Sequence, residues 1–168
     1  RYARRAGWDA VRDGAALFRE AVDEIGRTVA DERIACDWAK GGTLAAATTS
    51  PQADRLRAGL AASRERGLAG PGDRMLDAAE AATLVRVAGL RDASFTPDCA
   101  RFQPAALVRG LAEAAERRGV TIYEGTEALD IARGRVVTAA GDVHAAHIVQ
   151  TVEAWAPQLP GGMLTSLP

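Results

Sequence analysis

The sequence predicts a protein of mixed α and β class, α+β or α/β, in which flanking helices cover a mixed sheet and a β-meander follows. Three observations predict this class. Apolar residues recur at helical spacing near the start of the chain, a second amphipathic run follows Pro104, and the apolar period shortens to that of strands after Val120. With 168 residues the chain is long enough for one substantial core or for parts of two smaller domains.

The first predicted helix occupies most of residues 1–32. Its apolar residues alternate in steps of three and four, which places them in one stripe along the helix. This stripe consists of Trp8, Val11, Ala15, Phe18, Val22, Ile25 and Val29. A coiled-coil dimer would give the same stripe, but Gly14 and Gly26 stand where such a dimer carries flanking charges. The pattern therefore favours a helix packed on its own domain.

Residues 33–49 predict a β-hairpin, because a Gly41-Gly42 turn separates two short extended runs. A second helix is expected to follow, with Ser50 as its N-cap and Pro51 at its first position. Leu56 and Leu60 would form the buried face of this helix. The glycine-rich stretch 67–74 would end it.

A capping box of Asp77 and Glu80 predicts a short helix over residues 78–85, and residues 93–96 are expected to form a strand that ends at Pro97. Pro104 then begins the clearest helix, which Gly119 ends. Its outer face would carry an ion pair between Glu113 and Arg117. The residues expected to face inward are Leu107, Val108, Leu111, Ala112 and Ala115.

From Val120 onward the sequence predicts strands over residues 120–124, 126–132, 135–141, 142–146 and 147–152. Gly134 is expected to make one tight turn and Gly141-Asp142 the next, so that a three-stranded meander forms. An apolar strand from Ile148 to Val152 would follow the meander and lead to Trp155.

Composition narrows the class of partner. The formal net charge of −1 argues against nucleic acid and against an anionic membrane surface. No apolar run is long enough to cross a bilayer, and no signal peptide is recognisable. Cys36 and Cys99 are expected to be free thiols in a reducing compartment, so a cytoplasmic location is predicted. Because the chain begins at Arg1 within a helical pattern, we expect it to be a piece of a longer protein.

Metal and nucleophile chemistry have little support in the sequence. His144 and His147 are three residues apart, so at alternating strand positions their side chains would point to opposite faces. No Cys or acidic cluster accompanies them, and no metal site is predicted. The chain also lacks a GxSxG elbow, and no catalytic residue can be named from the sequence.

The order of segments from Asp92 onward resembles the FAD-dependent oxidoreductases of the D-amino-acid oxidase superfamily, which includes glycine and sarcosine oxidases. The pieces TPDCARFQPAALVRGLAEAAERRGV and TVEAWAPQLPG look most like the gamma-glutamylputrescine oxidase branch. CDWAKGGTLAAATTSPQADRLRA resembles the part of those enzymes where the substrate domain begins. The resemblance implies part of a two-domain FAD-binding fold, a flavin that oxidises the C–N bond of an amine or amino acid, and an enzyme active only when intact.

The resemblance also implies where the cofactor would bind. Thr126, Glu127 and Ala128 match the strand that passes the adenine, whose edge the family reads with backbone groups. The segment that closes over the ribose and pyrophosphate matches Thr151, Val152, Ala154 and Trp155. Substrate contacts would come from residues 34–96, where Trp38 and Phe95 are the aromatic candidates. Packing alone is the competing interpretation for both aromatic residues.

The same resemblance divides the chain into four segments. Residues 1–32 would be a helix of the flavin domain, 33–101 part of the substrate domain, 102–156 part of the FAD-binding domain, and 157–168 the start of the return to the substrate domain. The glycine-rich Rossmann phosphate loop of the family would precede this chain. A sheet that lacks its neighbouring strands would expose apolar surface, so we expect the chain to self-associate. The alternative function is a cofactor-free α+β module for binding or interaction.

Overall fold

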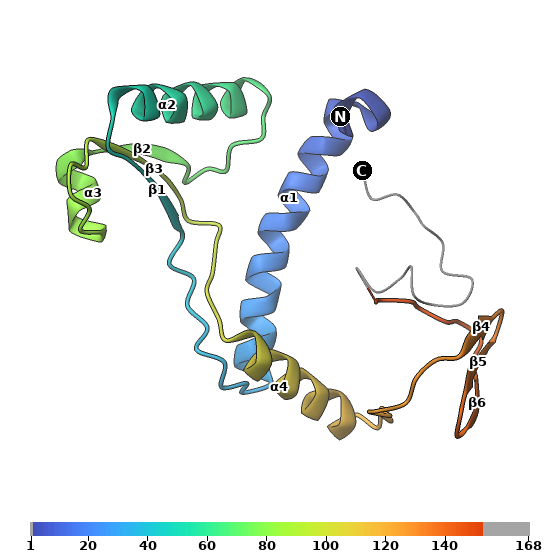
Figure 1. Cartoon of the computed structure of the whole chain (residues 1–168). Coiled ribbons are helices and arrows are strands. Elements are labelled where there is room, and N and C mark those ends of the chain that lie inside the picture. Colours follow the sequence, from blue (N-terminus) through green and yellow to red (C-terminus); the bar gives the residue numbers. More distant parts are fainter. Residues whose placement is uncertain (1, 153–168) are drawn as a thin grey trace. The chain divides into compact units, whose positions relative to one another are not determined.

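The computed structural model describes residues 2–152, which fall into two compact units divided between Gly119 and Val120. The first unit holds four helices and a three-stranded sheet, and the second holds a separate three-stranded sheet (Figure 1). Both sheets are antiparallel. This combination of helices and small sheets confirms the mixed α and β class.

Helix α1 spans Tyr2–Asp31 and is interrupted at Gly7, whose φ of 82° lies outside the helical range. Its end is closed by two backbone hydrogen bonds, from Arg33 N–H to the Ala30 carbonyl at 3.1 Å and from Ile34 N–H to the Val29 carbonyl at 2.9 Å. Arg33 takes the left-handed conformation, with φ 56°, that this helix ending requires. The ending also brings Ile34 onto Val29, and both belong to one buried cluster.

The sheet of the first unit consists of β1 (Thr43–Ala47), β2 (Arg74–Asp77) and β3 (Asp92–Thr96), with β3 in the centre. Helix α2 (Ser50–Glu65) connects β1 to β2 and packs along the sheet, and α3 (Ala78–Leu84) follows β2 directly (Figure 1). The buried core of this part is small: Leu76, Ala81 and Ala93 form one cluster, and Ala47 and Ala53 are buried as well.

The predicted hairpin around Gly41-Gly42 is wrong. Instead β1 pairs with β3, some fifty residues later in the chain, with Leu44 opposite Phe95. Gly42, at φ 80°, marks the close approach of two chain segments, since a Cβ there would lie 2.5 Å from the Thr96 carbonyl oxygen. Of the two predicted extended runs, only the second forms a strand, β1, and the sequence pattern could not name its partner.

Local start signals for the helices are largely confirmed. The Asp77 carboxylate accepts from Glu80 N–H at 2.8 Å and the Glu80 carboxylate accepts from Asp77 N–H at 3.0 Å, which is the predicted capping box. For α2 the N-cap is Thr49 rather than Ser50. The amide oxygen of Gln52 accepts from the N–H groups of Thr48 and Thr49, which fixes the earlier residue as the cap.

Helix α4 (Pro104–Arg117) packs on the end of α1 through Leu107, and Ala114 is its other buried residue. Two residues that were expected to face inward do not, because Val108 is 66% exposed and Leu111 is 42% exposed. Arg117 pairs with Glu32 across the two helices, and not with Glu113 as predicted. Gly110 of α4 faces Ile34 so closely that a Cβ there would lie 2.3 Å from Ile34 Cγ2.

The apolar stripe of α1 is fully buried only at its carboxyl end, while Val11, Ala15 and Val22 are half-buried. Val29 is buried, whereas Trp8 is 45% and Phe18 is 80% exposed. The helix itself is therefore confirmed, but most of the predicted packing along its stripe is absent from the described residues.

The second unit is a meander of β4 (Asp130–Ala132), β5 (Arg135–Thr138) and β6 (Gly141–His144). Gly134 makes the first turn with φ 77°, as predicted, but the second turn is Ala139-Ala140 and β6 begins at Gly141. The predicted strands over 120–124 and 147–152 are not formed, and 126–132 is a strand only at its end. A strand needs a partner for its backbone groups, and none pairs with these runs among residues 2–152.

Candidate cofactor and substrate site

The run of residues 120–129 carries the three positions predicted for adenine recognition. It is an extended loop with a turn at Glu124-Gly125, where Gly125 has φ 59° and Thr126 Oγ1 donates to the Glu124 carbonyl at 3.1 Å. Thr126 and Glu127 are exposed and Ala128 is half-buried. The loop joins the meander through Leu129, whose N–H donates to the Val137 carbonyl at 2.8 Å.

Adenine recognition by the backbone of this loop stays a prediction, and the structure shows which of its backbone groups lack a partner. Within the described residues, no backbone hydrogen bond outside regular elements involves Thr126, Glu127 or Ala128. Their N–H and carbonyl groups are therefore accessible to the polar edge of a planar ring. A pocket of about 180 Å³ lies beside the loop, between Thr126, Tyr123 and the turn at Thr138–Asp142.

The second group of predicted cofactor residues is described only in part. Thr151 is exposed and Val152 is half-buried, and neither belongs to a strand. Ala154 and Trp155 lie outside the described residues. The expectation that this segment closes over the ribose and pyrophosphate therefore stays a prediction.

The two predicted substrate aromatics lie in different surroundings. Phe95 stands on the sheet, where it packs against the buried cluster of Leu76, Ala81 and Ala93, and the Arg74 guanidinium lies 4.8 Å from the centre of its ring. Trp38 packs against the other core, next to Gly26 and stacked on Phe102 with 5.9 Å between ring centres. The structure does not bring these two side chains together.

A pocket of about 290 Å³ lies between α2 and the sheet. Phe95 lines it together with the hydroxyl-bearing residues Thr43, Ser94 and Thr96, and Leu56, Leu60 and Arg55 contribute from α2. Leu56 and Leu60 face the sheet, as the sequence predicted, but they line a pocket and are only half-buried. Of the two aromatic candidates, only Phe95 borders this space.

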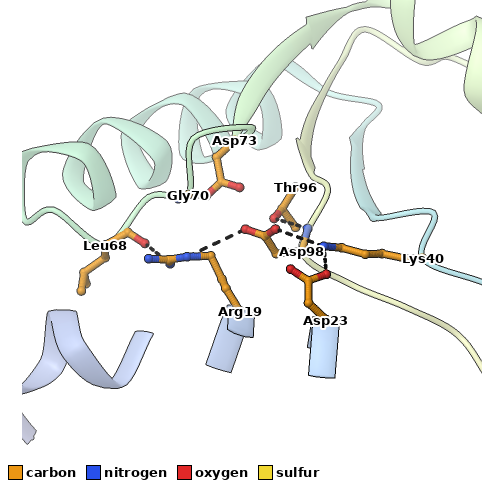
Figure 2. Close-up of polar contacts among 8 residues, drawn as sticks. All are labelled: Arg19, Asp23, Lys40, Leu68, Gly70, Asp73, Thr96 and Asp98. Carbon is orange, nitrogen blue, oxygen red and sulfur yellow. Dashed lines mark hydrogen bonds and ion pairs between the residues drawn. The ribbon is translucent and has the colours of Figure 1, made fainter. Parts of the chain in front are cut away.

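A polar cluster that the sequence analysis did not identify lies where α1 meets the sheet (Figure 2). The Asp98 carboxylate is 3.9 Å from Arg19 Nε and 4.0 Å from Lys40 Nζ, and Lys40 also pairs with Asp23. Asp73 Oδ2 accepts from Gly70 N–H at 2.9 Å. One oxygen each of Asp73 and Asp98 is buried without a hydrogen-bond partner. The only feature of the sequence that could have drawn attention to this cluster is Lys40, the single lysine of the chain.

A second charged group joins the ends of α1 and α4. The Glu32 carboxylate, 15% exposed, pairs with Arg118 and, at 3.2 Å, with Arg117. The hydrogen bond from Arg118 lowers the pKa of Glu32, with a smaller contribution from Arg117, and Glu32 in turn raises the pKa of Arg118.

Across residues 2–152 no group of three His, Cys, Asp or Glu side chains is placed to hold a metal ion. No helix there is long and apolar enough to cross a membrane.

Comparison with known proteins gives the class of the chain. The family described as DAO, FAD dependent oxidoreductase, matches residues 2–168. The chain belongs to this family, whose cofactor is FAD. No curated protein matches the chain significantly.

Solved structures of the same fold include enzymes that act on amino acids. The glycine oxidase from Geobacillus kaustophilus is 26% identical with a TM-score of 0.66, and the match covers 89% of this chain and 40% of that one. L-proline dehydrogenase from P. horikoshii is 16% identical with a TM-score of 0.68, over 86% and 40% of the two chains. L-Amino acid deaminase from Proteus myxofaciens, in complex with anthranilate, is 23% identical with a TM-score of 0.65, over 88% and 34%. This chain therefore spans 40% or less of the length of each of these structures.

Proposed function

We propose that the whole protein oxidises the C–N bond of an amine or amino acid with FAD as cofactor. The family match over residues 2–168 carries this proposal. The named activities of the similar structures support it, because a glycine oxidase, a proline dehydrogenase and an amino acid deaminase all act on such bonds. Among the branches of the family, the segments Thr96–Val120 and Thr151–Gly161 favour one similar to gamma-glutamylputrescine oxidase.

When bound, FAD supplies the oxidising power by accepting a hydride from the carbon next to the substrate nitrogen. The residues of this chain would bind FAD and orient the substrate. The backbone groups of Thr126, Glu127 and Ala128 would hydrogen-bond the adenine edge, and the segment with Thr151, Val152, Ala154 and Trp155 would lie against the ribose and pyrophosphate. Phe95 and the sheet around it would contribute to the substrate side, and no catalytic base is assigned among residues 2–152.

One buried cluster of the first unit lies within a single proposed domain, and the other crosses a proposed boundary. Val29 of α1 and Leu107 of α4 lie in segments assigned to the flavin domain, but Ile34 and Cys36, which complete their cluster, lie at the start of the segment 33–101. Leu76, Ala81 and Ala93 belong to the segment 33–101, which is assigned to the substrate domain. The free state of Cys36 and Cys99 supports the proposed cytoplasmic location.

The test is a visible absorption spectrum of the protein at its natural length, before and after incubation with excess FAD, followed by an amine and amino-acid screen. Flavin bands near roughly 375 and 450 nm that survive desalting, together with substrate-dependent bleaching without oxygen, are expected. A protein that is colourless after incubation with excess FAD and desalting would overturn the proposal and favour the cofactor-free module.

A pair of variants tests the backbone recognition of adenine. Glu127→Ala removes only the side chain, so the FAD dissociation constant should not change. Glu127→Pro also removes the N–H group, and it should raise the dissociation constant by about tenfold, the equivalent of one hydrogen bond. Circular dichroism would confirm that both variants are folded. Equal affinity in the two variants would contradict recognition by the N–H group of Glu127.

A further inference from the structure

The sheet of β1, β2 and β3 is joined to the core of α1 and α4 by only two stretches of chain, 35–42 and 97–103. They run antiparallel and exchange backbone hydrogen bonds: Ala39 and Arg101 bond to each other twice at 2.9 Å, and Gly42 N–H donates to the Cys99 carbonyl at 3.0 Å. We call these two stretches the connecting ribbon. A two-stranded ribbon is only marginally stable alone, so it is a place where the chain can bend.

Within the described residues, apolar packing holds the connecting ribbon to the core of α1 and α4 through Cys36 and Trp38, but no apolar cluster joins that core to the sheet. The cluster that contains Val29 and Leu107 and the cluster that contains Leu76 and Ala93 are separate, and they share no member. The contacts between α1 and the sheet region are instead mainly polar. Arg19 Nη1 donates to the Leu68 carbonyl at 3.3 Å, and Arg12 Nη1 donates to the Arg66 carbonyl at the same distance.

Two long ion pairs meet at Asp98, at the point where the connecting ribbon leaves β3 (Figure 2). Its carboxylate lies between Arg19 of α1 and Lys40 of the connecting ribbon, and Lys40 pairs with Asp23 of α1. We call Arg19, Asp23, Lys40 and Asp98 the Asp98 brace. The side chain of Asp98 is 19% exposed, so water screens its two ion pairs less than it screens pairs on an open surface.

The Asp98 brace is held by charge more than by directed hydrogen bonds. Both cations lie about 4 Å from the carboxylate, and Oδ2 of Asp98 has no hydrogen-bond donor. The loop 67–73 closes over the same oxygen, because a Cβ at Gly70 would lie 2.6 Å from it. Such a contact can open at small cost, and opening it would free the connecting ribbon to bend.

We propose that Asp98 is a positioning residue: the Asp98 brace fixes the sheet against α1, and its release lets the sheet move on the connecting ribbon. The consequence for catalysis rests on the proposed function, in which α1 belongs to the flavin side and the sheet to the substrate side. Loss of the brace then leaves cofactor binding intact and lowers the fraction of molecules in which the substrate is correctly placed for transfer.

The test compares Asp98→Asn with Asp92→Asn in the protein at its natural length. Asp92 stands at the other end of β3, is 21% exposed and pairs with Arg57 at 2.8 Å, but its partner lies on α2, so this pair does not cross to α1. Hydrogen–deuterium exchange of residues 36–42 and 97–103 is measured in both variants. We expect about fivefold faster exchange in Asp98→Asn, the effect of losing an ion pair of this kind, and none in Asp92→Asn.

The second readout is the rate constant of flavin reduction at saturating substrate without oxygen. It should fall by about fivefold in Asp98→Asn, while the FAD dissociation constant and the rate in Asp92→Asn are unchanged. Unchanged exchange in Asp98→Asn, or an equal change in Asp92→Asn, overturns the brace. Faster exchange with an unchanged reduction rate overturns the positioning role. A wild-type protein without flavin overturns the proposed function, and the exchange comparison still decides whether the brace exists.

Discussion

At the scale of single residues, close contacts decide more than residue type. Gly110 sits in the middle of α4 against Ile34, and a Cβ there would lie 2.3 Å from Ile34 Cγ2. Gly59 sits in the middle of α2 and meets nothing within 4 Å. Both are helical glycines, and nothing in the sequence separates them.

These two glycines make a matched pair of predictions. Gly59→Ala should raise the free energy of unfolding by about 0.5–1 kcal/mol, because alanine favours the helix. Gly110→Ala gains the same propensity but forces Ile34 aside, at a cost of about 1–3 kcal/mol, so the net change should be destabilising. Urea unfolding measures both, and stabilisation by Gly110→Ala would contradict the contact.

Glu32 gives a prediction about pH. Its pKa is lowered in the folded protein by the hydrogen bond from Arg118, so folding favours the charged form. The stability it contributes is therefore present above the unfolded-state pKa of about 4.3 and is lost as pH falls through the lower folded-state pKa. Glu32→Gln should lower the urea midpoint at pH 7, and the difference from the wild type should shrink below about pH 4. A difference that is constant across this range would contradict the role of the charge.

At the scale of elements, local sequence signals predict where helices start, whereas the sheet depends on pairing between residues far apart in the chain. The capping box of Asp77 and Glu80 forms as predicted, because both bonds lie within four residues of chain. The partner predicted for β1 was wrong, because the pairing of Leu44 with Phe95 depends on the path of the intervening chain. Whether a predicted strand forms also depends on a partner, which is why residues 120–124 remain a loop.

The cap of α3 can be tested directly. Asp77→Ala removes the acceptor for Glu80 N–H and should lower the free energy of unfolding by about 1 kcal/mol. Asp77→Asn keeps an acceptor at the same place, so its loss should be much smaller. Chemical denaturation of the two variants side by side measures the difference, and equal losses would show that the charge matters rather than the cap.

At the scale of the whole molecule, exposed apolar side chains stand out on α1. Leu17 is 63% and Phe18 is 80% exposed, although Phe18 belongs to the stripe that the sequence predicted to be packed. Exposed apolar surface of this kind favours association. The expected self-association of the chain therefore stays a prediction, and the exposed apolar side chains of α1 are the surface through which it would occur.

Static light scattering of the 168-residue chain over a range of concentrations tests it. The mean mass should rise with concentration, and Phe18→Ser should reduce the rise because it removes apolar area from the surface of α1. Ser94→Ala, on the sheet beneath α2, serves as the control. A chain that stays monomeric at every concentration would refute the prediction.

The sequence by itself determined the class of the protein, the helices that begin at Asp77 and Pro104, the turn at Gly134 and the family to which the chain belongs. These features depend on periodicity, caps and motifs, which act over a few residues or are shared along the whole chain. Only the tertiary structure decided that β1 pairs with β3, that Phe95 and Trp38 lie in separate surroundings, and that Asp98 meets Arg19 and Lys40. Contacts between residues far apart in sequence depend on how the chain turns back on itself, and no local pattern encodes that path.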